Sequence, residues 1–287
     1  MEIFELRYFL GVAQHQNLHR AAEKLNVSPA SLGKAVQRLE NELAVKLFTR
    51  QGRNIKITDH GRLLQKKASE IVQLEEATRL QVGGHRGSIR ISFAGPEVLL
   101  AEMGIAQSLE IKKRFPLSFF EYSHANDQTA IEQVSRGEAH LAIVTCELPT
   151  QSDLFAKPLC ETEFHTYCGD KHPLKSIAKS IIPVEKILTH PFASPNGSLF
   201  GQVGAKQSVD GWRDDKFPRQ VGFLSTSIKM LEELALRGQA LVYLPDYYGD
   251  RLGLTRLKIS GCPYSCKQKV KLVSRDPRES SWLRQIF

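Results

Sequence analysis

The stretch Asn17–Leu43, NLHRAAEKLNVSPASLGKAVQRLENEL, decides how the first part of this 287-residue chain folds. Its first half repeats apolar residues at helical spacing from Leu18 to Leu25, and its second half does the same from Leu32 to Leu43. Between the two stripes, Ser28 and Pro29 form a strong helix start, because the serine oxygen can accept an early backbone N–H and proline has none to leave unpaired. The pattern predicts two helices joined by about three residues, a helix-turn-helix.

The second helix has a polar face opposite its apolar stripe. An α-helix fits the major groove of B-DNA, where Arg and Lys can donate to guanine and Gln can pair with adenine. A glycine on this face would allow a base or phosphate to approach closely. The same pattern also suits the solvated side of an ordinary surface helix. The candidate DNA-binding residues here are Ser28, Ser31, Gly33, Lys34, Gln37 and Arg38.

The spacing of apolar residues changes from helical to alternating in the segment 47–57. Apolar residues alternate with polar ones around Gly52, which predicts a small β-hairpin, or wing. Arg50 and Arg53 lie near the tip of this hairpin, where cations could meet the phosphates that flank the groove. Both are therefore further candidate DNA-binding residues.

A long amphipathic helix is predicted after the wing. Thr58 can cap its start, and a narrow apolar seam continues to about Val82, before glycines at 83–87 end it. A long helix with one narrow seam usually packs against a partner, often a copy of itself. We therefore expect a winged helix-turn-helix domain over 1–58 and a linker helix over 59–84.

The charge of the chain is concentrated in its first third. The net charge is +8, from 39 Lys and Arg against 31 Asp and Glu, and residues 1–90 hold 15 basic and 9 acidic residues. This indicates a polyanionic partner for the first third. The sequence contains no run of ~18 apolar residues, so it predicts no membrane span. The first residues lack a secretory pattern and the five cysteines are irregularly spaced, so a reducing cytoplasm is the expected compartment.

The segment LRYFLGVAQHQNLHRAAEKLNVSPASLGKAVQRLENELAVKLFTR, followed by ITDHG, resembles the DNA-binding domain and linker helix of the LysR-type transcriptional regulators. The match keeps the order and spacing of that family without a gap. It rests on Leu6, Phe9, Ala21, Ala22, Leu25, Ser28, Leu32, Leu39, Glu40, Leu43, Leu47, Phe48, Arg50, Thr58 and Gly61.

Three positions depart from the family pattern. Pro29, Gly33 and Ala44 stand where the family usually has Gln, Ser and Gly. The first two positions face DNA in the family, so the resemblance implies an unusual operator or weaker direct readout. Lys34 occupies the family's usual Arg or Lys position.

The remaining two hundred residues alternate short apolar runs with helical stretches, which is typical of α/β units. The resemblance implies an effector domain of two Rossmann-like lobes, similar to periplasmic binding proteins, with the chain crossing between lobes twice. We expect lobe I over 88–162 and 267–287, and lobe II over 163–266. The C-terminal KVKLVSR is expected to be the strand that returns to lobe I, followed by a final short helix.

In open α/β sheets, small ligands bind beyond the carboxyl ends of the strands, near helix N-termini that favour anions. The segments expected to meet in such a cleft carry hydroxyl groups and free N–H groups that suit a carboxylate or another small polar effector. Glu97 beside them would instead favour a cationic or hydroxyl group. Plain turns and caps would use the same residue types. The candidate effector-binding residues are Gly95, Pro96, Thr145, Cys146, Asn196, Ser198, Ser225 and Thr226.

Other chemistries have weak support. Cys262 and Cys266 form a single C-x3-C pair without the second pair that a zinc site needs. His165, Cys168 and His172 lie close in sequence, but the segment is expected to be a strand and turn rather than a nucleophile–base site.

We therefore expect a one-component transcription factor without catalytic activity or cofactor, which binds double-stranded DNA under the control of an unidentified small effector. The resemblance implies a homodimer or tetramer paired through the linker helix, and RNA polymerase is the expected further partner. Two other classes remain open at this point. One is a small-molecule binding protein whose helix-turn-helix only dimerises, and the other is an enzyme built on the α/β lobes.

Overall fold

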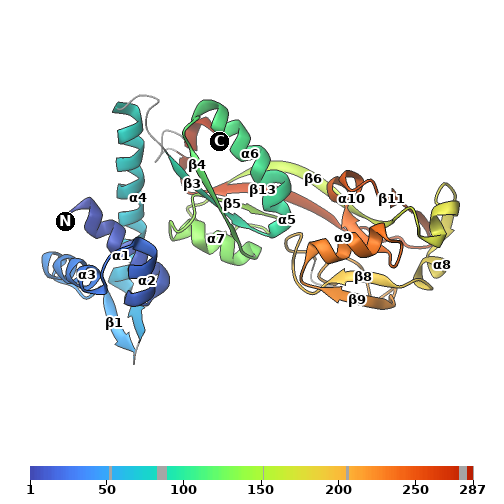
Figure 1. Ribbon diagram of the computed structural model, residues 1–287, viewed down its shortest axis with the longest axis horizontal. Helices are drawn as coiled ribbons and strands as arrows, with labels where there is room; N and C mark the ends of the chain where they lie inside the picture. The colour runs from blue at the N-terminus through green and yellow to red at the C-terminus, as the bar shows by residue number, and fades with distance from the viewer. Residues whose placement is uncertain (52–53, 83–88, 151, 205–206, 278–282, 287) are drawn as a thin grey trace.

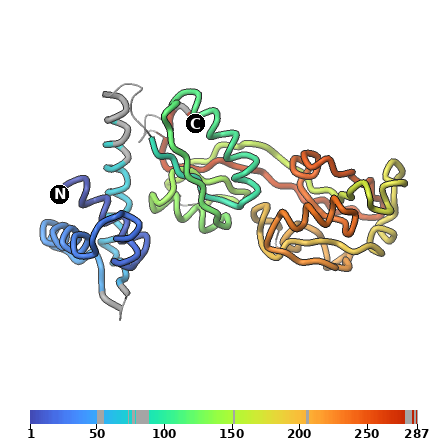
Figure 2. The backbone as a smooth tube through the Cα atoms, viewed as in Figure 1, coloured from blue at the N-terminus to red at the C-terminus, as the bar shows by residue number. Residues whose placement is uncertain are grey.

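The computed structural model describes the chain except for residues 52–53, 83–88, 151, 205–206, 278–282 and 287. The described residues form three bodies in a row, with the N-terminal helices and the long helix α4 at one end and two α/β bodies beside them (Figure 1). The backbone trace shows the two α/β bodies joined by extended segments of the chain (Figure 2). In the described part of the chain, no helix has both the length and the apolar character needed to cross a membrane.

The N-terminal domain has the predicted helix-turn-helix, wing and long helix. Asn17 caps α2 by accepting from the backbone N–H groups of His19 and Arg20, and Ser28 caps α3 by accepting from Ser31 at 3.1 Å. Apolar residues of α1, α3, the wing and α4 share one core. The elements are α1 (Ile3–His15), α2 (Leu18–Leu25), α3 (Pro29–Leu43), β1 (Phe48–Gln51), β2 (Asn54–Ile57) and α4 (Asp59–Val82).

Glu40 on α3 holds the wing against the helix. One carboxylate oxygen accepts from the backbone N–H groups of Leu47 and Phe48 at 2.8 and 3.3 Å, and the other lies 2.7 Å from Lys46 Nζ. Burial acts to raise the pKa of Glu40, but the bonds from Lys46 and the backbone outweigh it and lower the pKa. The charged carboxylate therefore ties the start of β1 to the recognition helix.

Lobe I is a parallel sheet covered by helices. Strand β3 pairs in parallel with both β4 and β5, with Gly95 opposite His124 at the carboxyl end. The helix after β3 differs from the expectation in one respect, because its turn over Leu100–Gly104 is a π-helix. The elements are β3 (Arg90–Gly95), α5 (Glu97–Leu99), α6 (Ile105–Arg114), β4 (Phe119–His124), α7 (Asp127–Ser135) and β5 (Leu141–Val144).

Lobe II has its own apolar clusters. Among its described strands, β8 pairs in parallel with β9 and β7 with β12, whereas β10 and β11 pair antiparallel with β6. Within the described tail, the expected final helix is a short 3-10 turn, Leu283–Gln285. The elements of lobe II are η3 (Pro173–Ile177), β7 (Ile181–Pro183), α8 (Val184–Leu188), β8 (Phe192–Pro195), β9 (Val221–Ser225), α9 (Ile228–Leu236), β10 (Val242–Pro245), α10 (Asp246–Arg251), β11 (Thr255–Arg256) and β12 (Lys258–Ser260).

Two long antiparallel strands connect the lobes. Strand β6 (Phe155–Cys168) and strand β13 (Lys267–Ser274) pair along their length, and the sheet order is β10-β6-β13-β5-β3-β4. The register shifts between Val270 and Lys271, which face Cys160 and Pro158. Proline cannot donate to a strand ladder, which suits an irregular position of this kind. The chain thus crosses between the lobes on two paired strands.

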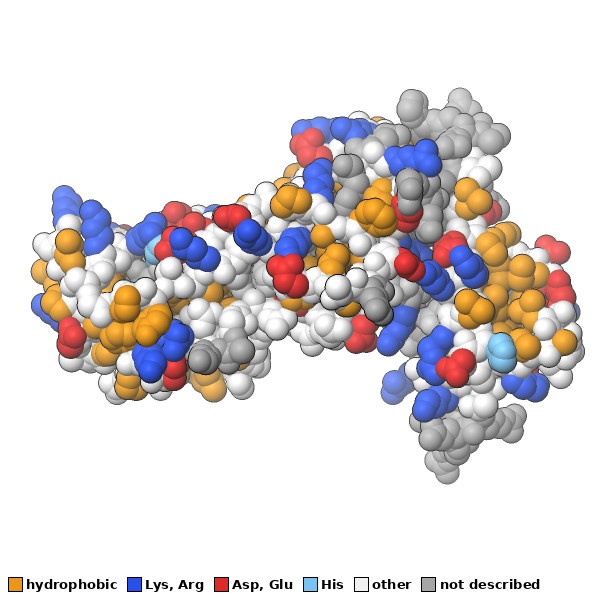
Figure 3. Space-filling view, turned by 180° about the vertical axis from the view of Figure 1, so that it is seen from behind, with side chains coloured by type: hydrophobic (Ala, Val, Ile, Leu, Met, Phe, Trp, Pro, Cys, Tyr) orange, Lys and Arg blue, Asp and Glu red, His pale blue; other side chains and the backbone are white. Residues whose placement is uncertain are grey.

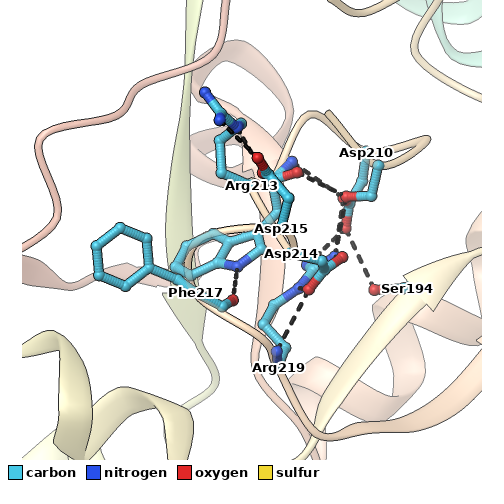
Figure 4. A network of polar contacts seen from close by, with 9 residues as sticks. Ser194, Asp210, Arg213, Asp214, Asp215, Phe217 and Arg219 are labelled. Atoms are coloured by element: carbon cyan, nitrogen blue, oxygen red, sulfur yellow. Dashed lines mark hydrogen bonds and ion pairs between the residues drawn. The ribbon is translucent and has the colours of Figure 1, made fainter. Parts of the chain in front are cut away.

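A buried ion-pair network fixes the long loop that follows β8 (Figure 4). The guanidinium of Arg219 is 1% exposed, and it contacts Asp210, which is 0% exposed, at 2.8 Å and Asp214 at 2.9 Å. The guanidinium also lies over the rings of Phe192 and Trp212. Because charges this deep cannot be hydrated, each depends on its partner. The network therefore anchors the loop that carries residues 201–220 across lobe II.

Removing one buried charge of this network should destabilise the chain strongly. We expect Asp210→Ala to lower the free energy of unfolding by up to about 3–5 kcal/mol, because the buried charge of Arg219 would keep only the partly exposed Asp214 as its partner. The matched control is Asp215→Ala, which breaks the exposed pair with Arg213 and should cost under about 1 kcal/mol. Urea denaturation checks both values, and equal effects would contradict the assigned role.

A substitution in the turn after α3 is expected to stabilise the protein, in contrast to Asp210→Ala. Ala44 has a φ of 54°, in the left-handed region that a Cβ disfavours by about 1–2 kcal/mol. We expect Ala44→Gly to stabilise the N-terminal domain by about 1 kcal/mol. Ala30→Gly, at an exposed position inside α3, is the control and should destabilise it by a similar amount. Thermal denaturation followed by circular dichroism measures both, and a destabilising Ala44→Gly would refute the expectation.

Candidate DNA interface and effector cleft

Helix α3 presents its predicted polar face to solvent. Ser31, Lys34 and Gln37 are exposed, whereas the apolar stripe from Leu32 to Leu39 is buried. Ser28 plays a local part as well, because its hydroxyl lies 2.8 Å from the hydroxyl of Ser31 while it caps the helix. The side chains that could reach a DNA groove are therefore held on a helix whose opposite face and start are both fixed.

Gly33 leaves one position of this face without a side chain. A Cβ added at Gly33 would meet nothing within 4 Å. A shallow groove of about 510 Å³ lies beside it, lined by Gly33, Gln37, Thr49 and residues of α1, α2, α3 and the wing. The fold does not require glycine at this position, so its small size matters for what approaches the helix from outside.

Arg38 forms an ion pair within the domain. Its guanidinium lies 3.6 Å from Glu5 on α1, although the Arg38 side chain is 66% exposed. On the wing, Arg50 belongs to strand β1, and Arg53 lies outside the described residues. Lys and Arg side chains gather on the part of the N-terminal domain beside the wing (Figure 3). Lys34 is thus a more accessible cation of α3 than Arg38.

The carboxylate of Asp127 is the centre of the junction between the lobes. It is 3% exposed, at the first turn of α7. Its Oδ2 atom accepts from Thr145 N–H at 3.1 Å, the Thr145 hydroxyl at 2.8 Å, Cys146 N–H at 3.1 Å and Gln202 N–H at 2.9 Å. Thr145 and Cys146 belong to lobe I, and Gln202 follows β8 in lobe II. One oxygen atom therefore joins the two lobes.

Gln202 is also held through its carbonyl oxygen. That oxygen accepts from Gln268 Nε2 at 2.9 Å, and it lies 3.0 Å from the Thr145 hydroxyl, which has one proton to share between Gln202 and Asp127. Gln268 lies on β13, one of the two crossing strands, and is 6% exposed. The same backbone residue therefore contacts lobe I, the crossing strand and Asp127.

The glycine next to Gln202 brings its backbone close to Thr145. A Cβ at Gly201 would lie 2.4 Å from Thr145 Oγ1, and the Gly201 φ is +86°. Ser198 supports this turn by donating to the carbonyl oxygen of Gly201 at 2.5 Å. Three of the predicted effector residues, Thr145, Cys146 and Ser198, therefore meet at this junction.

The other predicted effector residues lie at two strand ends. Gly95 ends β3, and its carbonyl oxygen accepts from Ala125 N–H at 2.9 Å, next to the start of α7. Pro96, beside Gly95, is buried. In lobe II, Asn196 N–H donates to the carbonyl oxygen of Ser225 at 2.8 Å, so the ends of β8 and β9 lie together, with Thr226 exposed beside them.

Sequence reasoning missed Asp127, Gln202 and Gln268. Asp127 stands at the start of a helix, which is an ordinary place for aspartate. A usable signal was its position directly after a strand that ends at the expected cleft. Gln202 and Gln268 carry no such signal, because their roles arise from contacts with distant segments.

The far end of α7 contacts the linker helix. Ser69 of α4 is 3% exposed and donates to the carbonyl oxygen of Gly137 at 3.1 Å, and Gln65 Nε2 donates to Glu138 at 3.1 Å. Burial raises the pKa of Glu138. Helix α7 therefore has the lobe junction at its N-terminal end and the linker helix at its C-terminal end.

The rejected chemistries gain no support. Burial raises the pKa of the Cys168 thiol, whereas a nucleophilic cysteine needs a lowered one. All five cysteines are free. Across the residues that the structure describes, no group of three or more His, Cys, Asp or Glu side chains could hold a metal ion.

A winged helix-turn-helix joined through a long helix to a two-lobed α/β domain is the architecture of a one-component transcriptional regulator. The family model described as a bacterial regulatory helix-turn-helix protein of the lysR family matches residues 3–62, and the LysR substrate binding domain model matches residues 84–284. The chain belongs to the LysR family of DNA-binding transcriptional regulators, which carry an effector-binding domain.

Individual relatives match over different lengths. The transcriptional dual regulator GltC of Bacillus subtilis is 31% identical over 86% of this chain and 81% of its own length. The HTH-type regulator BsdA of Bacillus subtilis is 29% identical, over 50% of this chain and 51% of its own. The probable cat1 operon transcriptional activator of Acinetobacter lwoffii is 38% identical, over 31% of this chain and 30% of its own. The matched part of the chain thus covers about half of the length of BsdA and 30% of the length of the cat1 activator.

Solved structures share the complete architecture. A full-length OxyR variant from Pseudomonas aeruginosa matches with a TM-score of 0.66 at 19% identity, covering 100% of this chain and 94% of that chain. Full-length CbnR complexed with its target DNA matches with a TM-score of 0.54 at 16% identity, covering 100% of both chains. At these identities the likeness concerns the fold alone.

The contact between α7 and α4 can be tested with one added methyl group. Gly137 has a φ of +75°, and a Cβ there would lie 1.9 Å from Ser69 Oγ. We expect Gly137→Ala to separate the two segments and to speed hydrogen exchange in α4 around residues 65–69. Gly253→Ala is the matched control, because its φ is +68° with nothing within 4 Å of a Cβ, so it carries only the backbone cost. Equal exchange in the two variants would refute the contact.

Proposed function

We propose that this regulator binds a specific operator through the exposed face of α3 and the wing, and that a small effector in the cleft between the lobes modulates this binding. The observation that carries the first part is the face of Ser31, Lys34 and Gln37, exposed over a buried stripe on a capped helix. Ser28, Gly33, Arg38, Arg50 and Arg53 complete the proposed DNA-binding set.

The effector site is proposed where the carboxyl ends of β3 and β5 meet the turns of lobe II. Thr145, Cys146 and Ser198 lie at the junction centred on Asp127. Gly95 and Pro96 flank it from lobe I, and Asn196, Ser225 and Thr226 are proposed as its outer side in lobe II. Because Asp127 and Gln202 join the lobes directly, a ligand here would bind differently to open and closed arrangements, which is what regulation by a ligand requires.

We propose that α7 carries the change to the linker helix. Its first turn holds Asp127 in the junction, and the residues after its last turn contact Gln65 and Ser69 of α4. A short rigid helix with contacts at both ends moves as a unit. A shift between the lobes would therefore change how α4 is held.

The remaining assignments are also proposals. Leu63 and Leu74 on α4 are 63% and 60% exposed, which supports pairing of two chains through this helix in a dimer or tetramer. Contact with RNA polymerase, the absence of enzymatic activity and a cytoplasmic location rest on the regulatory class of the family. The proposed domain limits are 1–58, 59–84, 88–162 with 267–287, and 163–266, and the boundary at 162/163 falls inside β6.

The salt dependence of the affinity for duplex DNA distinguishes a DNA-binding helix-turn-helix from one that only dimerises. Cations that bind phosphates release counterions, so the affinity for duplex DNA should fall steeply as salt rises. A dimerisation module would show no such binding. CbnR, which shares the fold, has been solved with its target DNA, and this favours the DNA-binding hypothesis.

A variant of the recognition helix tests the proposal. A randomised duplex pool is first selected with the wild-type chain to obtain a binding sequence. We expect Lys34→Ala to weaken binding to that sequence about tenfold or more, because it removes an exposed cation of α3.

Lys112→Ala is the control, since it removes the same charge from the exposed side of α6 in lobe I. Its affinity for the selected duplex should equal that of the wild type. Failure to select any duplex at low salt, or equal affinities for all three proteins, would refute the assignment of α3.

A further inference from the structure

The junction between the lobes already contains an anion. Asp127 accepts the backbone N–H groups of Thr145, Cys146 and Gln202 on a single oxygen atom. These N–H groups at the strand and helix ends are the donors that an anionic ligand would use. The protein's own carboxylate occupies them, and a carboxylate ligand would also be repelled by its charge.

Two buried acceptor atoms at the junction remain unused. Asp127 Oδ1 and Gln268 Oε1 are both buried, and neither has a hydrogen-bond partner among the described residues. The side chains of Asp127 and Gln268 are 3% and 6% exposed. A buried acceptor without a donor is costly, so two such atoms on neighbouring side chains indicate a place for a donor.

The two side chains bind the backbone of the same residue. Asp127 accepts from the N–H of Gln202, and Gln268 donates to the carbonyl oxygen of the same residue. These two bonds also fix the orientation of both groups, because they use Oδ2 of Asp127 and Nε2 of Gln268. The atoms that remain are therefore both oxygens, one of them carrying charge.

The surrounding charge is consistent with a cation. Glu97, an exposed carboxylate, opens the helix that follows Gly95, and the Gly95 carbonyl oxygen accepts from Ala125, two residues before Asp127. Burial, and after it the charge of Asp127, raise the pKa of Cys146 to about 11 against the opposing charge of Lys271. Lys271 also lies near Cys146. Its ammonium group is paired with Glu147 at 2.6 Å and donates to the Cys146 carbonyl oxygen at 3.4 Å.

We propose that the effector of this regulator carries a cationic donor group, a protonated amine, amidine or guanidine, which binds between Asp127 Oδ1 and Gln268 Oε1. This inference rests on the proposed effector cleft and names the chemistry that the cleft accepts. It replaces the expectation that the cleft suits a carboxylate.

The test uses the full-length chain without DNA and pairs of probes that share a carbon skeleton. Benzamidine is compared with benzoate, butylamine with butyrate, and putrescine with succinate, by thermal shift and then by calorimetric titration. We expect at least one cation to raise the melting temperature of the wild type, and its carboxylate partner to leave the melting temperature unchanged.

The decisive variant is Asp127→Asn. Its amide oxygen can still accept the bonds of the junction, while its amide nitrogen replaces Oδ1 and donates instead. We expect cation binding to weaken on the order of 10- to 100-fold, with the preference moving toward the carboxylate probes. Glu110→Gln on α6, an exposed position, removes the same charge elsewhere and should bind the cation as the wild type does. Gln268→Met provides a second variant in which cation binding should weaken.

The proposal is overturned if no cation in the panel stabilises the wild type, if carboxylates stabilise it equally, or if Asp127→Asn and Gln268→Met both retain full cation binding. Duplex selection with the wild type at low salt is performed separately. A chain that selects DNA but shows no cation response refutes this inference alone, whereas a chain that responds to cations but selects no DNA refutes the proposed regulatory function.

Discussion

The antiparallel pairing of β6 with β13 is the constraint on which the C-terminal domain depends. These strands extend from one lobe into the other, so the lobes share one sheet and can change their relation only by bending or twisting that pair. The register shift beside Pro158 marks a position where the ladder is already interrupted. The lobes are therefore joined at a common base, and the contacts at the Asp127 junction add a second connection between them.

Those contacts converge on Asp127, and this gives the cleft its chemical character. A buried carboxylate that accepts four bonds on one oxygen is firmly oriented, and its second oxygen is buried without a donor among the described residues. A charge in this position can hold the lobes together and can select a ligand by its sign. In our proposal, the junction both holds the lobes together and recognises the ligand, which would couple ligand binding to lobe geometry.

The connection to DNA passes through helices rather than loops. Helix α7 extends from the junction to α4, and α4 packs into the core of the N-terminal domain with α1 and the wing. In that domain, Glu40 ties the wing to α3, so the proposed DNA-contacting elements form one unit. Each step joins packed elements through apolar contacts or partly buried hydrogen bonds, which is the kind of connection that can transmit a discrete change.

The sequence alone determined the helix-turn-helix, the wing, the linker helix and the exposed face of α3, because these features depend on periodicity, caps and turns among near neighbours. It also predicted an effector cleft near the ends of β3, β5 and β8, which stays a prediction. Only the tertiary structure revealed Asp127, Gln202 and Gln268 as partners, and the internal pairing of Arg38 with Glu5. Partnerships between residues as many as 75 positions apart leave no local pattern, and the unused oxygens become visible only after every other hydrogen bond has been assigned.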